Sequence, residues 1–80
     1  MNQYFYVTIQ TMLDETQPMA IYGKESYDAA LQTLYSDMAY AINNTNCMSI
    51  ICLIINSIGN VERKETWYRP APTVNPSVEE

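Results

Sequence analysis

The sequence predicts a small α+β domain in which one helix packs on a mostly antiparallel sheet of three or four strands. Three observations predict it: an alternating segment from Tyr4 to Met12, a helical stripe from Ser26 to Asn43, and two later extended segments joined by a glycine turn. A chain of 80 residues with 48% hydrophobic and 16% charged residues has the composition of one folded domain. We expect this domain to span residues 1–69 and residues 70–80 to form a flexible, proline-containing acidic tail.

The first strand should have one dry face and one amphipathic face. Phe5, Val7 and Ile9 share the aliphatic side, whereas Tyr4 and Tyr6 lie on the other. A turn should follow at residues 14–18, because aspartate bonds its own backbone and proline cannot pair in a ladder. Residues 19–22, closed by a glycine, fit either a short returning strand or an extended lead into the helix.

A helix should begin after Ser26, which reads as an N-cap, with Asp28 in the first turn near the positive end of the helix dipole. Asparagines at positions 43, 44 and 46 should end it, since asparagine tolerates the left-handed conformation and competes for backbone hydrogen bonds. Because successive residues of a helix are rotated by 100°, one stripe along this predicted helix is apolar. Its members are Tyr27, Ala30, Leu31, Leu34, Met38, Ala41 and Ile42.

The segment from Cys47 to Asn56 is apolar on both faces, a pattern typical of a strand that is covered on both sides. Gly59 marks a tight turn. The segment from Val61 to Arg69 that follows has an alternating pattern and many charged residues, which is typical of an edge strand protected against pairing with other chains. Strand order stays open. The first strand and Cys47–Asn56 could be parallel neighbours across the helix, or the charged strand could lie between them in an antiparallel sheet.

Composition excludes most catalytic and metal-binding arrangements. The chain has no histidine, two glycines and two cysteines, so neither a tetrahedral zinc site nor a glycine-rich phosphate loop can form within it. We therefore expect no cofactor and no enzyme. On one strand, Cys47 and Cys52 should point to opposite faces about 16 Å apart, so they should be free thiols in a reducing compartment.

The net charge of −5 argues against binding to nucleic acid or to an anionic membrane. Residues 47–55, the most apolar window, fall short of the roughly 20 residues that span a bilayer. The first residues lack the pattern of a secretory signal. We expect a cytoplasmic protein.

One helix can cover only one face of such a sheet, so a second copy is the simplest cover for the other face. Tyrosine and tryptophan suit contact surfaces because they bury a large area at low entropic cost. We therefore expect a homo-oligomer, a dimer in the first instance, or binding to another protein. The predicted interaction surface comprises Tyr4, Tyr6, Ile51, Leu53, Ile55, Trp67 and Tyr68.

Several short segments carry a resemblance to known sequences: Tyr4-x-Tyr6-Val7-x-Ile9-Gln10-Thr11, Asp28-Ala29-Ala30 with Tyr35 and Ala39, Ile54-Ile55-Asn56-x-x-Gly59-Asn60-Val61 and Glu65-x-Trp67-Tyr68-Arg69-Pro70. In these the chain resembles short proteins, without an assigned function, that phages and prophages of Firmicutes encode. The resemblance implies a phage origin and transfers no catalytic residue.

Two functions follow as hypotheses. The first is a non-enzymatic interaction module that self-associates through its sheet or, as the resemblance implies, binds a host or phage protein. The alternative is a phage-encoded inhibitor of a host enzyme or defence protein that acts through an acidic surface.

Overall fold

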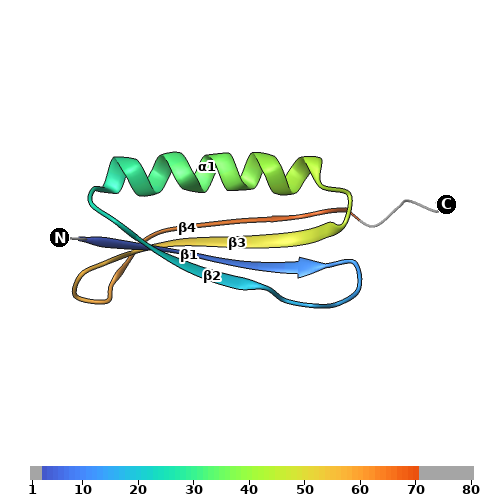
Figure 1. Cartoon of the computed structure of the whole chain (residues 1–80), viewed down its shortest axis with the longest axis horizontal. Coiled ribbons are helices and arrows are strands. Elements are labelled where there is room, and N and C mark those ends of the chain that lie inside the picture. The colour runs from blue at the N-terminus through green and yellow to red at the C-terminus, as the bar shows by residue number, and fades with distance from the viewer. Residues whose placement is uncertain (1–2, 71–80) are drawn as a thin grey trace, which may run out of the picture.

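The computed structural model describes residues 3–70, which form one open four-stranded sheet with a single helix across one face (Figure 1). The elements are β1 (Tyr4–Met12), β2 (Met19–Lys24), α1 (Tyr27–Asn43), β3 (Cys47–Asn56) and β4 (Val61–Tyr68). The predicted α+β class is confirmed, and residues 19–24 are a strand. Of the predicted tail, residues 71–80 lie outside the described part of the chain.

The strand order is β2-β1-β3-β4, and every neighbouring pair is antiparallel. Neither strand order considered from the sequence is therefore correct. β1 and β3 are neighbours, but they run in opposite directions because β2 has already reversed the chain before α1 crosses the sheet. The charged strand β4 lies at an edge, as its charge predicts.

Both ends of α1 are set by local side chains. The Ser26 hydroxyl accepts a hydrogen bond from the Ala29 amide at 3.1 Å, which confirms the predicted N-cap. At the other end, Asn44 is extended, with φ at −95°, and not left-handed as the sequence suggested. Its carboxamide oxygen instead accepts from the Asn46 amide at 3.1 Å, so the side chain redirects the chain through a local turn.

The two hairpin turns follow the residues that predict them. Asp14 Oδ1 accepts from the Thr16 amide at 3.1 Å, and the residue between them, Glu15, is left-handed with φ at 72°. Between β3 and β4, Gly59 has φ at 94°, the conformation for which glycine is suited. Asn56 Oδ1 closes this second turn by accepting from the Asn60 amide at 2.9 Å.

A register shift near the start of β3 places both cysteines on the same side of the sheet. Thr11 pairs with Ser49, whereas Met12 pairs with Cys47, so one extra residue enters β3 at this point. The prediction that Cys47 and Cys52 point to opposite faces is therefore wrong, because the bulge interrupts the alternation on which it rested. Both are free, buried and part of the core cluster.

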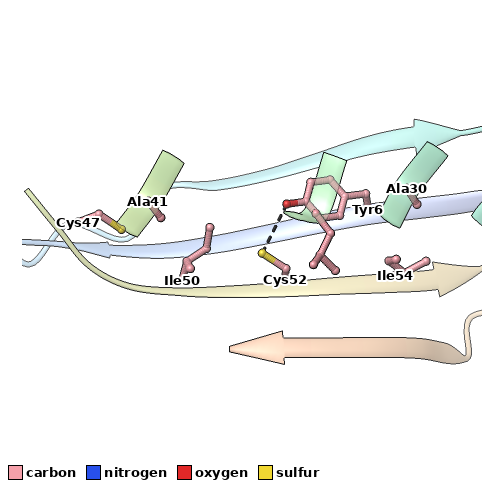
Figure 2. Packing of buried hydrophobic residues seen from close by; sticks show 8 residues of the cluster. Tyr6, Ala30, Ala41, Cys47, Ile50, Cys52 and Ile54 are labelled. Atoms are coloured by element: carbon pink, nitrogen blue, oxygen red, sulfur yellow. Dashed lines mark hydrogen bonds between the residues drawn. The ribbon is translucent and has the colours of Figure 1, made fainter. Parts of the chain in front are cut away.

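The core lies between α1 and the face of the sheet that it covers (Figure 2). Its buried members are Tyr6, Ala30, Leu34, Ala41, Cys47, Ile50, Cys52 and Ile54. Most of the predicted helix stripe points into this core, but Ile42 is 45% exposed. The covered face of β1 is the tyrosine face, because Tyr6 contacts the helix and the alternating Phe5, Val7 and Ile9 point the other way.

Candidate functional site: the open face of the sheet

The face of the sheet opposite α1 is mostly apolar, and no element of residues 3–70 covers it (Figure 1). The pairing places Val7 between Ile21 of β2 and Leu53 of β3 on this side. We call this surface the open face. It comprises Phe5, Val7, Ile9 and Thr11 of β1, Met19 and Ile21 of β2, Ser49, Ile51, Leu53 and Ile55 of β3, and Val61, Lys64, Thr66 and Tyr68 of β4.

Exposure increases from the centre of the open face to its edges. Val7 is only 8% exposed because neighbouring strands crowd it, whereas Ile21 at one edge is 63% exposed and Tyr68 at the other is 74% exposed. The members of this face on β1, β2 and β3 carry no charge, and Lys64 on the edge strand β4 is charged. On small domains, exposed apolar patches often coincide with interaction sites.

The predicted interaction residues are divided between the two faces of the sheet. Ile51, Leu53, Ile55 and Tyr68 lie on the open face. The other three, Tyr4, Tyr6 and Trp67, belong to the helix side and pack in or against the core. Tyr6 is fully buried, so its assignment to an exposed surface is wrong.

The aliphatic residues of β1 and β2 are the part of the site that sequence reasoning missed. Phe5, Val7 and Ile9 were expected to form the dry face of the first strand, yet they lie on the open face, and Met19 and Ile21 extend it. One feature of the sequence could have indicated them: β3 is apolar on both of its sides, so both faces of the sheet must have apolar residues. The sequence could not indicate which of them the helix covers.

Behind the open face, Tyr6 links three elements through its hydroxyl. It donates to Asp37 Oδ2 at 2.9 Å. It also approaches Cys52 Sγ at 3.5 Å, a contact that Figure 2 shows. Burial, followed by these two contacts, raises the pKa of the Tyr6 phenol far above its ordinary range. Burial also raises the pKa of the Cys52 thiol. A protonated thiol and phenol are poor nucleophiles, so this network stabilises the core and offers no catalytic group.

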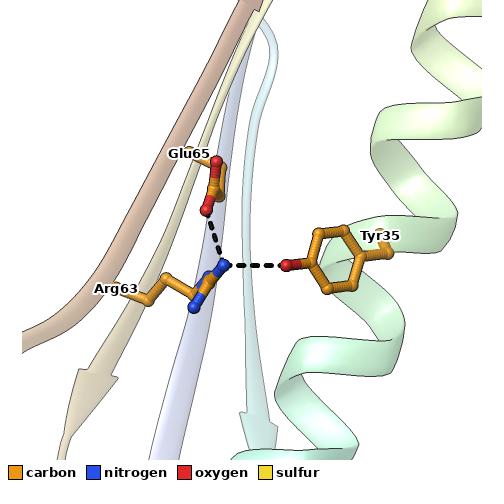
Figure 3. Close-up of polar contacts among 3 residues, drawn as sticks. All are labelled: Tyr35, Arg63 and Glu65. Atoms are coloured by element: carbon orange, nitrogen blue, oxygen red, sulfur yellow. Dashed lines mark hydrogen bonds and ion pairs between the residues drawn. The ribbon is translucent and has the colours of Figure 1, made fainter.

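On β4, Arg63 connects the sheet to the helix. Its Nη2 donates to the Tyr35 hydroxyl at 2.8 Å and lies 2.9 Å from Glu65 Oε2 (Figure 3). Arg63 and Glu65 lie two residues apart on β4, so alternation puts them on the same side of the sheet, and both side chains are about one third exposed. A partly exposed ion pair of this kind contributes little to stability.

At the end of β4, Arg69 binds the C-terminal end of the helix and the chain that follows it. Its Nη2 donates to the carbonyl oxygens of Ile42 and Asn44 at 3.1 Å each, and its Nε donates to that of Cys47 at 3.2 Å. The guanidinium carbon lies 4.9 Å from the centre of the Trp67 ring. The sequence places Arg69 at the end of the charged strand, and in the structure it is a half-buried structural contact.

Other features that could support chemistry are few. Within residues 3–70 no group of three histidine, cysteine, aspartate or glutamate side chains could hold a metal ion. In the same residues no helix has the length and apolarity needed to cross a bilayer. One hollow of about 480 Å³ lies beside the β1–β2 turn, lined by Met12, Leu13 and Asn46 among others, and a smaller one lies between β2 and α1. The open face is the dominant candidate site.

Comparison with family models, with curated proteins and with solved structures finds no match to this chain.

Proposed function

We propose that the protein is a non-enzymatic interaction module that forms a homodimer by packing the open faces of two copies against each other. The observation that carries the proposal is the mostly apolar surface that crosses all four strands opposite α1. Two sheets that pack in this way lie about 10 Å apart, with strand directions within roughly 30°. The two helices would then form the outer layers.

The area of the open face is sufficient for such a pair. Four strands about 4.8 Å apart and about eight residues long, at 3.3 Å per residue, give roughly 500 Å² per copy. Two copies would bury roughly 1,000 Å² in total, which reaches the lower range of specific interfaces. A domain of 80 residues has a thin stability margin by itself, so this burial would also stabilise the fold.

The distribution of charge also favours a second copy. In the described residues the carboxylates lie in turns, on α1 or on β4, and the part of the open face on β1, β2 and β3 carries no charge. The net charge of −5 therefore places little repulsion at the centre of the interface. An apolar face whose charged side chain, Lys64, lies on an edge strand matches a copy of itself better than it matches a charged partner.

The experiment is solution mass by light scattering after size exclusion, from about 1 to 500 µM. We expect a mass near twice 9.2 kDa for the wild type. Ile51→Lys places a charge at the centre of the open face and should give the monomer mass, because a desolvated lysine has no counter-ion there. Ile42→Lys, at a helix residue that is 45% exposed, is the matched control and should remain a dimer.

A wild type that stays monomeric across this range would refute the dimer. It would also favour the alternative function, a phage-encoded inhibitor that presents the open face or an acidic surface to a host protein. The acidic residues within 3–70 do not gather on one face, so we rank self-association first. The proposed cytoplasmic location fits either function, since Cys47 and Cys52 are both free thiols.

A further inference from the structure

On the helix side of the sheet, the strip above β2 forms a groove. Helix α1 packs mainly over β1 and β3, and the core cluster draws its strand residues from these two strands. Between α1 and β2 a hollow of about 220 Å³ remains, lined by Thr8, Ala20 and Tyr22 of the sheet and by Asp37 and Tyr40 of the helix, among others. The short side chain of Ala20 keeps the groove open toward the edge of the sheet.

β2 is an edge strand without the charges that usually protect an edge. It carries Lys24 as its only charged residue, whereas the opposite edge, β4, carries four charges in a row. The Gln10 amide donates to the Pro18 carbonyl, and alternation along an antiparallel ladder then directs the backbone groups of Met19, Ile21 and Gly23 away from β1. These outward amides and carbonyls can accept a further strand.

The chemistry of the groove fits a cationic side chain. The Tyr6 hydroxyl holds Asp37 Oδ2 in place at 2.9 Å, which leaves Oδ1 to bind a donor from outside. The rings of Tyr22 and Tyr40 are 50% and 68% exposed and line the same hollow, so they can stack on a planar cation. The volume is below the roughly 300–1,000 Å³ of small-molecule pockets, and it suits a single side chain.

We propose that β2 accepts an extended segment of a partner protein as a fifth, antiparallel strand, and that an arginine of this segment enters the groove and binds Asp37. Arginine fits because its planar guanidinium pairs with a carboxylate and stacks on aromatic rings. In antiparallel pairing, a residue beside Ala20 and a residue beside Lys24 are four positions apart on the partner. An acidic residue four positions before the arginine would then meet Lys24.

This site lies on the opposite side of the sheet from the open face, so a homodimer leaves it accessible. The inference is independent of the proposed function, and the two can fail separately. A second copy does not supply the occupant from β2 itself, because the residues of β2 include no arginine.

The test measures fluorescence anisotropy of a labelled peptide, Ser-Glu-Val-Thr-Val-Arg-Val-Ser, titrated with the full chain. We expect saturable binding with a dissociation constant below about 1 mM, and a loss of about tenfold or more when the arginine of the peptide is replaced by glutamine. The reversed peptide, Ser-Val-Arg-Val-Thr-Val-Glu-Ser, should bind more weakly. With its arginine in the groove, its glutamate lies beside Lys24 only if the peptide runs parallel to β2.

Variants of the protein locate the binding site. Asp37→Asn keeps an acceptor for Tyr6 and should weaken binding about tenfold, whereas Ala20→Phe should fill the groove and abolish binding. Asp28→Asn removes the same charge nine residues, or about 13 Å, away on the same helix and is the matched control. Ile51→Lys on the open face should leave peptide affinity unchanged. Circular dichroism verifies that each variant folds. If Asp37→Asn does not fold, the peptide affinity of Ala20→Phe tests whether the groove is the binding site.

Three results would overturn the proposal. Absence of binding at 1 mM contradicts the added strand. Equal affinity for the arginine and glutamine peptides, or full affinity in Asp37→Asn, contradicts the arginine site. Loss of binding in Ile51→Lys with retention in Ala20→Phe would place the peptide on the open face instead.

Discussion

Arg69 contributes to stability far more than its position near the end of the domain suggests. The last carbonyl groups of an α-helix lack intrahelical partners, and α1 has no basic residue in its last turn. Arg69 reaches these groups from β4, and its hydrogen bonds to the Ile42, Asn44 and Cys47 carbonyls lie between 3.1 and 3.2 Å. Replacing it should therefore loosen the helix end, the α1–β3 connection and the end of β4 together.

The magnitude follows from these contacts. Three charge-assisted hydrogen bonds, at about 1 kcal/mol each for a half-exposed site, and a cation–π contact with Trp67 worth about 0.5–1 kcal/mol predict that Arg69→Met costs about 3–4 kcal/mol. A protein of this size has a total stability of only about 4–12 kcal/mol. The midpoint of thermal unfolding should fall by at least roughly 12 °C.

Urea unfolding, followed by circular dichroism and by the fluorescence of Trp67, the single tryptophan, measures this loss. Arg69→Lys keeps the charge but not the forked geometry, so it should recover about half of the stability. Lys24→Met removes a positive charge from β2, at a side chain that makes none of these contacts, and should change the free energy of unfolding by less than about 0.5 kcal/mol. A loss below about 1 kcal/mol in Arg69→Met would refute the reasoning.

Three further predictions concern the core and the helix. Tyr6→Phe leaves Asp37 without its donor and should cost about 1–2 kcal/mol in urea unfolding at pH 7. The pKa of Tyr6 is raised in the folded state, so above about pH 10 the phenol keeps its proton in the folded protein but loses it in the unfolded chain. The free energy of unfolding should therefore fall by about 1.4 kcal/mol per pH unit in this range. Tyr6→Phe should show a weaker dependence, since only the raised pKa of the Cys52 thiol then remains, and identical pH profiles would contradict it. Cys47 and Cys52 are buried, so both should react with a thiol reagent only as fast as the protein unfolds. Reaction at the rate of free cysteine would contradict this and make a reactive thiol a candidate functional group. Ser26→Ala should cost about 1 kcal/mol and Ser26→Asp should restore it, and equal stability of the two would exclude a capping role.

The elements of this fold depend mostly on local signals, and the sequence by itself determined them. The α1 N-cap at Ser26, the positive φ at Gly59 and the edge position of β4 follow from neighbours within a few residues or from charge along one strand. The same holds for the two apolar faces of β3. These features hold in the structure because each is decided by local backbone chemistry or by simple alternation.

The tertiary structure alone decided how these elements are used. Alternation shows that β1 has two faces, but only packing shows that α1 covers the face of Tyr6 and leaves that of Val7 open. The bulge at the start of β3 also moved Cys47 to the side of Cys52, which no spacing rule could reveal.

The role of Arg69 depends on contacts 22 to 28 residues away along the chain, and the groove at β2 depends on which strands the helix leaves uncovered. A local pattern carries no information about such partners. The sequence therefore determined the helix, the strands and the turns, whereas the covered face, the strand order and both candidate binding surfaces were fixed only when distant segments packed together, because burial depends on three-dimensional neighbours.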